Sequence, residues 1–159
     1  MFSILLLSET TLADHDAARI VDLHGTEGVA IHLLVPADAA HNRLIEALDD
    51  VTLGRLRDAL DDDTPTPEQA EQDAMHAVNA SLDKLRAVGI TSTQGSVTGS
   101  DPVPAAIEAV RQDGADEIIV VTPPHPVESG LHRDWASRLR DELELPVLHV
   151  VSGTDRVVS

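Results

Sequence analysis

The sequence predicts an α/β fold: a five-stranded, doubly wound parallel sheet with helices on both faces, of the Rossmann-like kind. Its 159 residues make one domain, large enough to bury roughly 68–70% of the surface that the unfolded chain exposes. Short continuous apolar runs recur, as strands buried on both faces require. Segments with apolar residues at helical spacing separate these runs, and such alternation is typical of parallel sheets. We expect one domain over residues 1–153 and a C-terminal tail over residues 154–159.

The first 36 residues predict a strand, a helix and a second strand. Phe2–Ser8 is a continuous apolar run that predicts a buried strand. Apolar residues at helical spacing then predict an amphipathic helix over residues 13–24, which Gly25 ends. Val29–Val35 predicts the second buried strand, closed by Pro36. A strand, a helix and a strand within this length form the start of a parallel, right-handed crossover unit.

The middle of the chain predicts two helices and an edge strand. Residues 39–62 carry apolar residues at helical spacing, with a plausible break in the middle. A second helix is predicted to begin after Thr66, because a threonine N-cap followed three residues later by Gln69 forms a capping box. Gly89 ends this helix. Thr91–Thr98 is polar and contains glycine, so we expect it to be a strand at the edge of the sheet.

The last third repeats the alternation of helix and strand. A helix is predicted around Ala106 and Val110 and ends at Gly114. Glu117–Val121 has the most strongly buried strand pattern, a helix is predicted over residues 131–144, and Pro146–Val151 is the fifth strand.

Charge and composition restrict the partners of the chain. Acidic residues outnumber basic ones by 28 to 11, which gives a formal net charge of −17. Nucleic acid and anionic membrane surfaces are therefore disfavoured, because binding them relies on clustered Lys and Arg. No cysteine is present, which excludes disulfides, thiolate metal sites and cysteine nucleophiles. With no apolar run long enough to span a membrane, we expect a cytoplasmic protein.

Eight histidines raise the question of a metal site, and their positions argue against one. No paired spacing such as His-Glu-x-x-His occurs. His32 and His149 fall within strands, so we expect partnered core or interface residues. His24 lies at a helix end, where a cation complements the helix dipole. The histidines expected on solvated helix surfaces are His15, His41 and His76.

The order of elements and three stretches resemble the universal stress protein family of adenine-nucleotide-binding α/β folds. Val97–Pro102 is similar to the third strand of the family and the turn that follows it. Gly114–Val121 resembles its Gly-Ala-Asp sequence and fourth strand, and Pro146–Val151 matches its closing strand. The resemblance spans nearly the whole chain and rests on the order and spacing of these pieces.

The family's usual ATP motif, Gly-x2-Gly-x9-Gly-(Ser/Thr), is absent here. Where the family has its first two glycines, this chain has Thr122 and His125. Ser129 and Gly130 resemble part of the Ser-Gly-Leu sequence of the family. Prolines remove backbone N–H donors from the loop that would cradle phosphate. Three occur in it: Pro123, Pro124 and Pro126.

The resemblance implies a degenerate nucleotide site at the carboxyl ends of the strands, where open α/β sheets bind ligands. Glu9 stands where the family commonly has an aspartate, followed by Thr10 where glycine is common. The full set of candidate site residues is Glu9, Thr10, Val35, Pro36, Thr122, His125, Ser129 and Gly130. His125 has two interpretations: it contacts a small anion or nucleotide, or it packs in a rigid proline loop.

We expect a cytoplasmic homodimer that pairs through Pro146–Val151 and acts in stress response as a regulatory or interaction module, possessing no cofactor and no catalytic residues. The alternative is a nucleotide-binding switch that holds AMP, adenosine or ATP with Mg in the degenerate site. An enzyme of the wider nucleotide-hydrolase group is a third possibility. It would need a nucleophile or base, and no nucleophile signature occurs.

Overall fold

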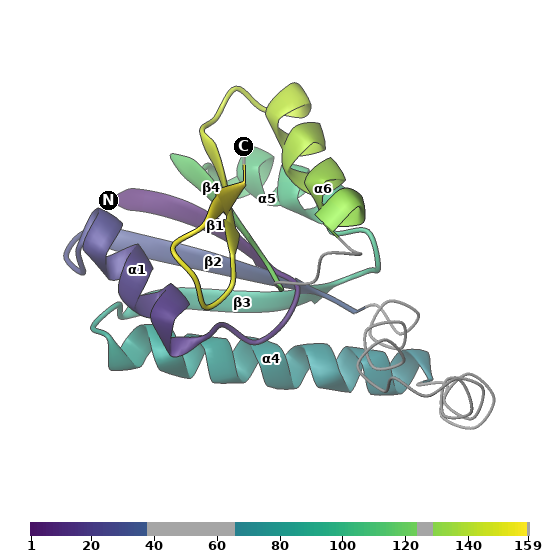
Figure 1. The fold of residues 1–159 in the computed structure, drawn as a ribbon, viewed down its shortest axis with the longest axis horizontal. Helices are drawn as coiled ribbons and strands as arrows, with labels where there is room; N and C mark the ends of the chain where they lie inside the picture. The colour runs from purple at the N-terminus through teal and green to yellow at the C-terminus, as the bar shows by residue number, and fades with distance from the viewer. Residues whose placement is uncertain (38–65, 124–128, 159) are drawn as a thin grey trace.

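The computed structural model describes residues 1–37, 66–123 and 129–158. These residues form one mixed sheet with the strand order β3-β2-β1-β4-β5-β6 (Figure 1). The strands are β1 (Phe2–Ser8), β2 (Val29–Pro36), β3 (Ser92–Thr98), β4 (Glu117–Thr122), β5 (Val147–Val151) and β6 (Val157–Val158). The helices are α1 (Asp14–His24), α4 (Pro67–Ala87), α5 (Val103–Asp113) and α6 (Ser129–Glu142).

The first five strands are all parallel, as predicted. The polar strand β3 is at one edge of the sheet, also as predicted. The sixth strand was not predicted: β6 pairs antiparallel with β5, so the sheet has one antiparallel strand at its other edge. The helix predicted over residues 39–62 lies outside the described residues.

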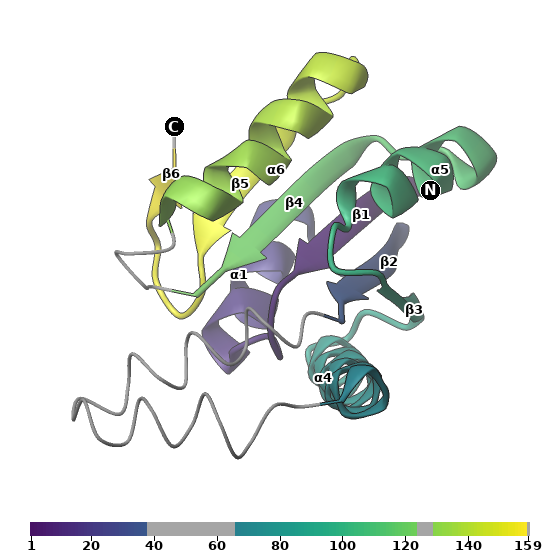
Figure 2. The same cartoon turned by 90° about the vertical axis from the view of Figure 1, so that its right-hand side faces the viewer.

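Two layers of helices enclose the sheet, and this confirms the doubly wound fold class (Figure 2). The α1 and α4 helices pack on one face, where Leu6 and Leu33 belong to the same hydrophobic cluster as residues of both helices. The α5 and α6 helices pack on the other face, where Leu5 and Leu7 point. Consecutive residues of β1 thus face opposite layers, which explains why its sequence is continuously apolar.

The α4 helix begins where its sequence predicts. The Thr66 side chain accepts a hydrogen bond from the Gln69 backbone N–H at 3.1 Å, and the Gln69 side chain accepts one from the Thr66 N–H at 2.9 Å. This reciprocal pair satisfies two N–H groups at the helix start. The helix then packs closely on β3, because a Cβ atom at Gly95 would lie only 2.6 Å from the Cγ1 atom of Val78.

The C-terminal hairpin is tied to the start of α1. Asp16 is only 3% exposed, although it is a charged residue in the first turn of α1. Its carboxylate accepts hydrogen bonds from the Ser152 hydroxyl at 2.6 Å, from the Gly153 N–H at 2.8 Å and from the Ala13 N–H at 2.9 Å. Three donors compensate for the burial of this charge, and two of them come from the turn between β5 and β6.

A second carboxylate links the helices of the other layer. Asp101, just before α5, accepts a hydrogen bond from the Val103 N–H at 3.2 Å and two from Arg138 on α6 at 3.1 and 2.9 Å. The Arg138 hydrogen bonds lower the pKa of Asp101. Both side chains are partly exposed, so solvent weakens this link between α5 and α6.

Candidate functional site

Three of the predicted site residues lie level with one another across the centre of the sheet. Leu7 pairs with Leu34 on one side and with Val120 on the other. Two residues further along, the same register brings Glu9 level with Pro36 and Thr122. The strand order reverses between β1 and β4, and the carboxyl ends of strands at such a switch point are where open α/β sheets bind ligands.

The Glu9 side chain sits at the centre of this row. It is 5% exposed, and its backbone N–H donates a hydrogen bond to the Val121 carbonyl at 3.2 Å. Thr10 follows and is half-buried. The turn is held by the buried Ser8, whose hydroxyl donates to the Thr10 carbonyl at 2.6 Å. Predicted neighbours Val35 and Pro36 are buried at the end of β2, so the structure brings these residues together as expected.

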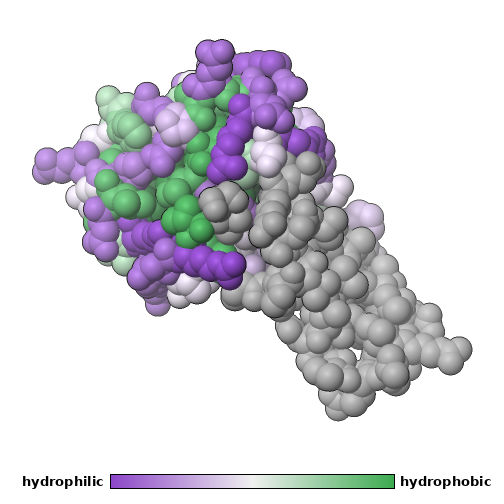
Figure 3. Space-filling model, turned by 45° about the horizontal axis from the view of Figure 1, so that its top comes forward, coloured by the Kyte–Doolittle hydropathy of each residue, from purple (hydrophilic) through white to green (hydrophobic). Residues whose placement is uncertain are grey.

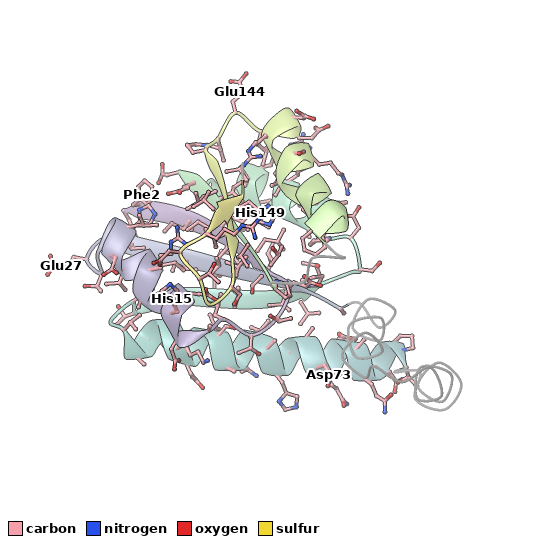
Figure 4. All side chains as sticks on the ribbon, in the orientation of Figure 1. Phe2, His15, Glu27, Asp73, Glu144 and His149 are labelled. Carbon is pink, nitrogen blue, oxygen red and sulfur yellow. The ribbon has the colours of Figure 1, made fainter. Side chains whose placement is uncertain are left out.

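Thr122 faces a buried histidine that the sequence did not assign to the site. Its Oγ1 atom lies 2.9 Å from Nε2 of His149 on β5, within hydrogen-bond distance, and both residues are buried. His149 comes from the face of the sheet that α6 covers (Figure 4). The prediction that His149 is a partnered core histidine is confirmed. Its partner belongs to the candidate site, so His149 holds the Thr122 hydroxyl in a fixed direction.

We predict that Thr122→Val lowers the free energy of unfolding by about 1–2 kcal/mol, because it leaves a buried imidazole nitrogen without the Thr122 hydroxyl. Valine has nearly the same shape as threonine, so little packing is lost. Urea unfolding of the two proteins measures the difference. Thr122→Ser keeps the hydroxyl and is the matched control: a serine variant as unstable as the valine variant would show that the hydrogen bond is not the cause.

The remaining predicted site residues are only partly within the described chain. His125 lies outside the described residues, so both interpretations of it stay open. Ser129 and Gly130 are the first two residues of α6, and only their backbone is described. No group of three or more His, Asp or Glu side chains that could hold a metal ion occurs among residues 1–37, 66–123 and the described side chains from 135 onward. No helix in these same parts of the chain is long and apolar enough to cross a membrane.

The row of Glu9, Pro36 and Thr122 offers hydrogen-bond acceptors and a hydroxyl group, and none of these three residues is basic. Glu9 contributes a carboxyl group and Thr122 a hydroxyl group, and Pro123 follows without a backbone N–H. Such a set suits a neutral ligand with hydrogen-bond donors better than a polyphosphate, which needs N–H groups or cations.

A separate cavity of about 330 Å³ opens at the opposite end of the strands. It lies at the amino ends of β1, β2 and β3, beside the last turn of α5. Polar side chains within it include His32, Gln94 and Asp113. His32 also lies 3.4 Å from the Ser96 hydroxyl, which agrees with its prediction as a partnered strand histidine. This cavity is far along the strands from Glu9 and Thr122.

Burial of His32 makes stability depend on pH. Desolvation lowers its pKa below the usual histidine value of 6.5, and nearby Asp113 opposes this effect more weakly. The unfolded chain therefore takes up the proton first, so this contribution to stability is present above pH 6.5 and is lost as the pH falls through the folded-state pKa. We predict that His32→Gln reduces the loss of stability between neutral and mildly acidic pH. Urea unfolding at both pH values measures this loss of stability. The control is His76→Gln, at an exposed position on α4. An unchanged pH dependence in His32→Gln would contradict the prediction.

Two further histidines lie close to carboxylates. His24 at the end of α1 lies 2.9 Å from the Glu117 carboxylate and stacks on Phe2 with ring centroids 5.0 Å apart. His15 is exposed and lies 2.8 Å from the Asp155 carboxylate, on the side of α1 near the C-terminal hairpin (Figure 4). His76 is exposed as predicted, whereas His41 lies outside the described residues.

No family model and no curated protein sequence matches this chain at a significant level. Solved structures do match it. A universal stress protein family protein from Arabidopsis thaliana with AMP bound has a TM-score of 0.56 at 11% sequence identity, covering 96% of this chain and 94% of the other. A universal stress protein in complex with cAMP also has a TM-score of 0.56 at 11% identity, covering 96% and 98%.

A third solved structure, described as a hypothetical protein, has a TM-score of 0.51 at 14% identity and covers 97% of both chains. Matches at this level of identity establish the fold and its extent along the chain. They also agree with the observed strand order and with the two helical layers. This chain therefore has the fold of the universal stress proteins, as its order of strands and helices predicted.

Proposed function

We propose that this chain is a regulatory or interaction module of the universal stress protein type, and that it does not hold ATP through a glycine-rich phosphate loop. One observation carries the proposal. At the switch point, the buried Glu9 lies level with Thr122, and Thr122 is followed by Pro123. Thr122 and Pro123 stand where a phosphate-binding loop needs small residues with free N–H groups.

Electrostatics supports this proposal. The chain has a formal net charge of −17, and an acidic field lowers the local concentration of polyanions. We therefore expect ATP to bind less well than a ligand of the same base and sugar with fewer phosphates.

A protein partner would find apolar surface beside β5. Leu23 on α1 is 54% exposed and lines a shallow groove together with Leu148 and Val150 of β5. Figure 3 shows hydrophobic residues gathered into a connected area, with hydrophilic residues around it. Exposed apolar surface rimmed by polar residues is typical of interaction sites, which favours an interaction role over catalysis.

A second candidate function is a switch that binds adenosine or AMP. The specific support is that two solved structures of the same fold hold AMP and cAMP. In this chain, Glu9 could accept hydrogen bonds from ribose hydroxyls or a base amine, and Thr122 could contribute its hydroxyl. Fewer phosphates would then mean fewer unfavourable contacts with the acidic site.

A thermal-shift series on dialysed protein tests both candidates. ATP, ADP, AMP, cAMP and adenosine are each added with and without magnesium. A ligand at a hundred times its Kd stabilises the fold by about 2.7 kcal/mol, which raises Tm by several degrees in a domain of this size. No shift with any nucleotide supports the interaction module. A shift with adenosine or AMP that is lost in Glu9→Gln supports the switch, and a large shift with ATP contradicts the first proposal.

A further inference from the structure

The cavity at the amino ends of β1, β2 and β3 exists because three neighbouring strands carry small residues there. Ala30 of β2 pairs with Ser3 of β1 on one side and with Ser92 of β3 on the other. This row lies on the face that α5 and α6 cover, since Leu5, two residues beyond Ser3, belongs to the hydrophobic cluster on that face. Three short side chains leave a hollow where larger residues would fill the space.

The next row of the sheet gives the cavity its polar side chains. His32 of β2 pairs with Leu5 on one side and with Gln94 of β3 on the other. Both His32 and Gln94 line the cavity, and Asp113 in the last turn of α5 lines it as well. Gln94 is exposed, so the cavity is open to solvent. Its volume of about 330 Å³ is in the range of pockets that hold small ligands.

The end of α5 favours a positive charge at this cavity. The last carbonyl groups of a helix have no partner within it, and they carry the negative end of the helix dipole. Asp113 is the last residue of α5 and adds a full negative charge at the same point. A carboxylate gains nothing from the dipole at this end, whereas a bound cation would be attracted by both. Local choices that conflict with helix stability are expected at functional sites.

The other charges near the cavity also favour a cation. None of the described residues that line it is Lys or Arg. Burial lowers the pKa of His32, so its imidazole is neutral at neutral pH and does not repel a cation. The Asp116 carboxylate lies at the same end of the sheet, where it accepts a hydrogen bond from the Ser3 N–H at 2.8 Å. The net charge of −17 raises the local concentration of cations further.

The lining matches one chemical class of ligand. An ammonium group has three N–H donors and no acceptor, and the cavity offers it the Asp113 carboxylate, the Gln94 carbonyl and serine hydroxyls. Apolar side chains beside them, those of Leu5, Ala30 and Ala109, suit a short aliphatic chain. We propose that this cavity binds a small organic cation, a primary ammonium group on a short aliphatic chain, through the carboxylate of Asp113.

A titration of the ¹⁵N-labelled full chain with putrescine, a four-carbon diamine, tests the proposal. Ionic strength is held constant with sodium chloride, so general screening does not change. We expect saturable shifts in the amide signals of His32, Gln94 and Gly114, which line the cavity. The compound 1,4-butanediol has the same chain length without charge, and should leave these amides unshifted at the same concentrations.

Two matched variants test the role of the carboxylate. Asp113→Asn keeps the shape of the side chain and removes its charge, and should raise the Kd for putrescine about tenfold or more, because a charged hydrogen bond is lost. Asp73→Asn makes the same change of net charge at an exposed position on α4, the helix on the other face of the sheet (Figure 4). This control should leave the Kd nearly unchanged.

A third variant separates the cavity from attraction to the acidic surface. Ala30→Leu fills the hollow and leaves Asp113 in place, so it should abolish the shifts while the amide spectrum remains that of a folded protein. Four results would overturn the proposal: no saturable shift with putrescine, equal shifts with 1,4-butanediol, equal weakening by the two aspartate variants, or unchanged binding in Ala30→Leu. Each of them is independent of whether a nucleotide binds at the opposite end of the strands.

Discussion

Replacing Asp16 by alanine is expected to lower the free energy of unfolding by about 3 kcal/mol, because three donors lose a buried, charged acceptor. The hydroxyl of Ser152 and the N–H groups of Gly153 and Ala13 all bond to this carboxylate. In a domain of this length the change corresponds to a fall in Tm of roughly 6–12 °C. The effect is large because one side chain joins the start of α1 to the far end of the chain.

Differential scanning calorimetry of Asp16→Ala measures this fall. Asp22→Ala on the same helix is the control, since Asp22 is exposed and its loss should change stability by no more than about 0.5 kcal/mol. Equal effects from the two substitutions would mean that helix propensity or net charge is responsible. In that case the buried contacts of Asp16 contribute little.

The second large effect is expected at Leu6, which is 0% exposed at the centre of β1. It belongs to the cluster between the sheet and the layer of α1 and α4. Leu6→Ala removes apolar area and leaves a cavity, and we expect a loss of about 3–5 kcal/mol, or roughly 6–20 °C in Tm.

Urea unfolding monitored by circular dichroism tests the prediction for Leu6. Leu23→Ala removes the same atoms from a residue that is 54% exposed, and should cost no more than about 0.5 kcal/mol. A cost at Leu6 as small as that at Leu23 would contradict the placement of β1 at the centre of the core.

The regular elements could be predicted because their signals are local. Phe2–Ser8 is apolar at consecutive positions, which only a strand covered on both faces requires, and the strand has these bounds. The start of α4 was recognisable because Thr66 and Gln69 are three residues apart. Parallel strands separated by helices then leave few topologies, so the fold class followed from the order of elements.

Contacts between distant residues could not be predicted in this way. Two of the three partners of Asp16 are separated from it by 136 and 137 residues, and no local pattern signals that this acid is buried. The sequence of β6 is only two residues long, too short to show any alternation. Its role depends on the position of β5, which is a property of the folded sheet.

The candidate site was predictable in part. Pro36 and Thr122 each end a strand, and Glu9 directly follows one. Parallel register brings strand ends together, so the juxtaposition of these residues followed from the topology. The partnership of Thr122 with His149 needs the exact register of β4 and β5. Strand alternation would have placed both side chains on one face, but it could not show that they meet.

The most direct test of the altered phosphate site is a titration of the ¹⁵N-labelled full chain with ATP, followed by its amide NMR signals. Adenosine is titrated in parallel to separate binding of the nucleoside from binding of phosphate. We predict that ATP leaves the amides of Thr122 and of the first turn of α6 unshifted, because Pro123 has no backbone N–H and residues 122–128 contain no glycine that would let backbone amides approach phosphate. Saturable shifts of these amides with ATP, larger than those with adenosine, would show that the loop after β4 binds phosphate and would contradict the proposed loss of ATP binding.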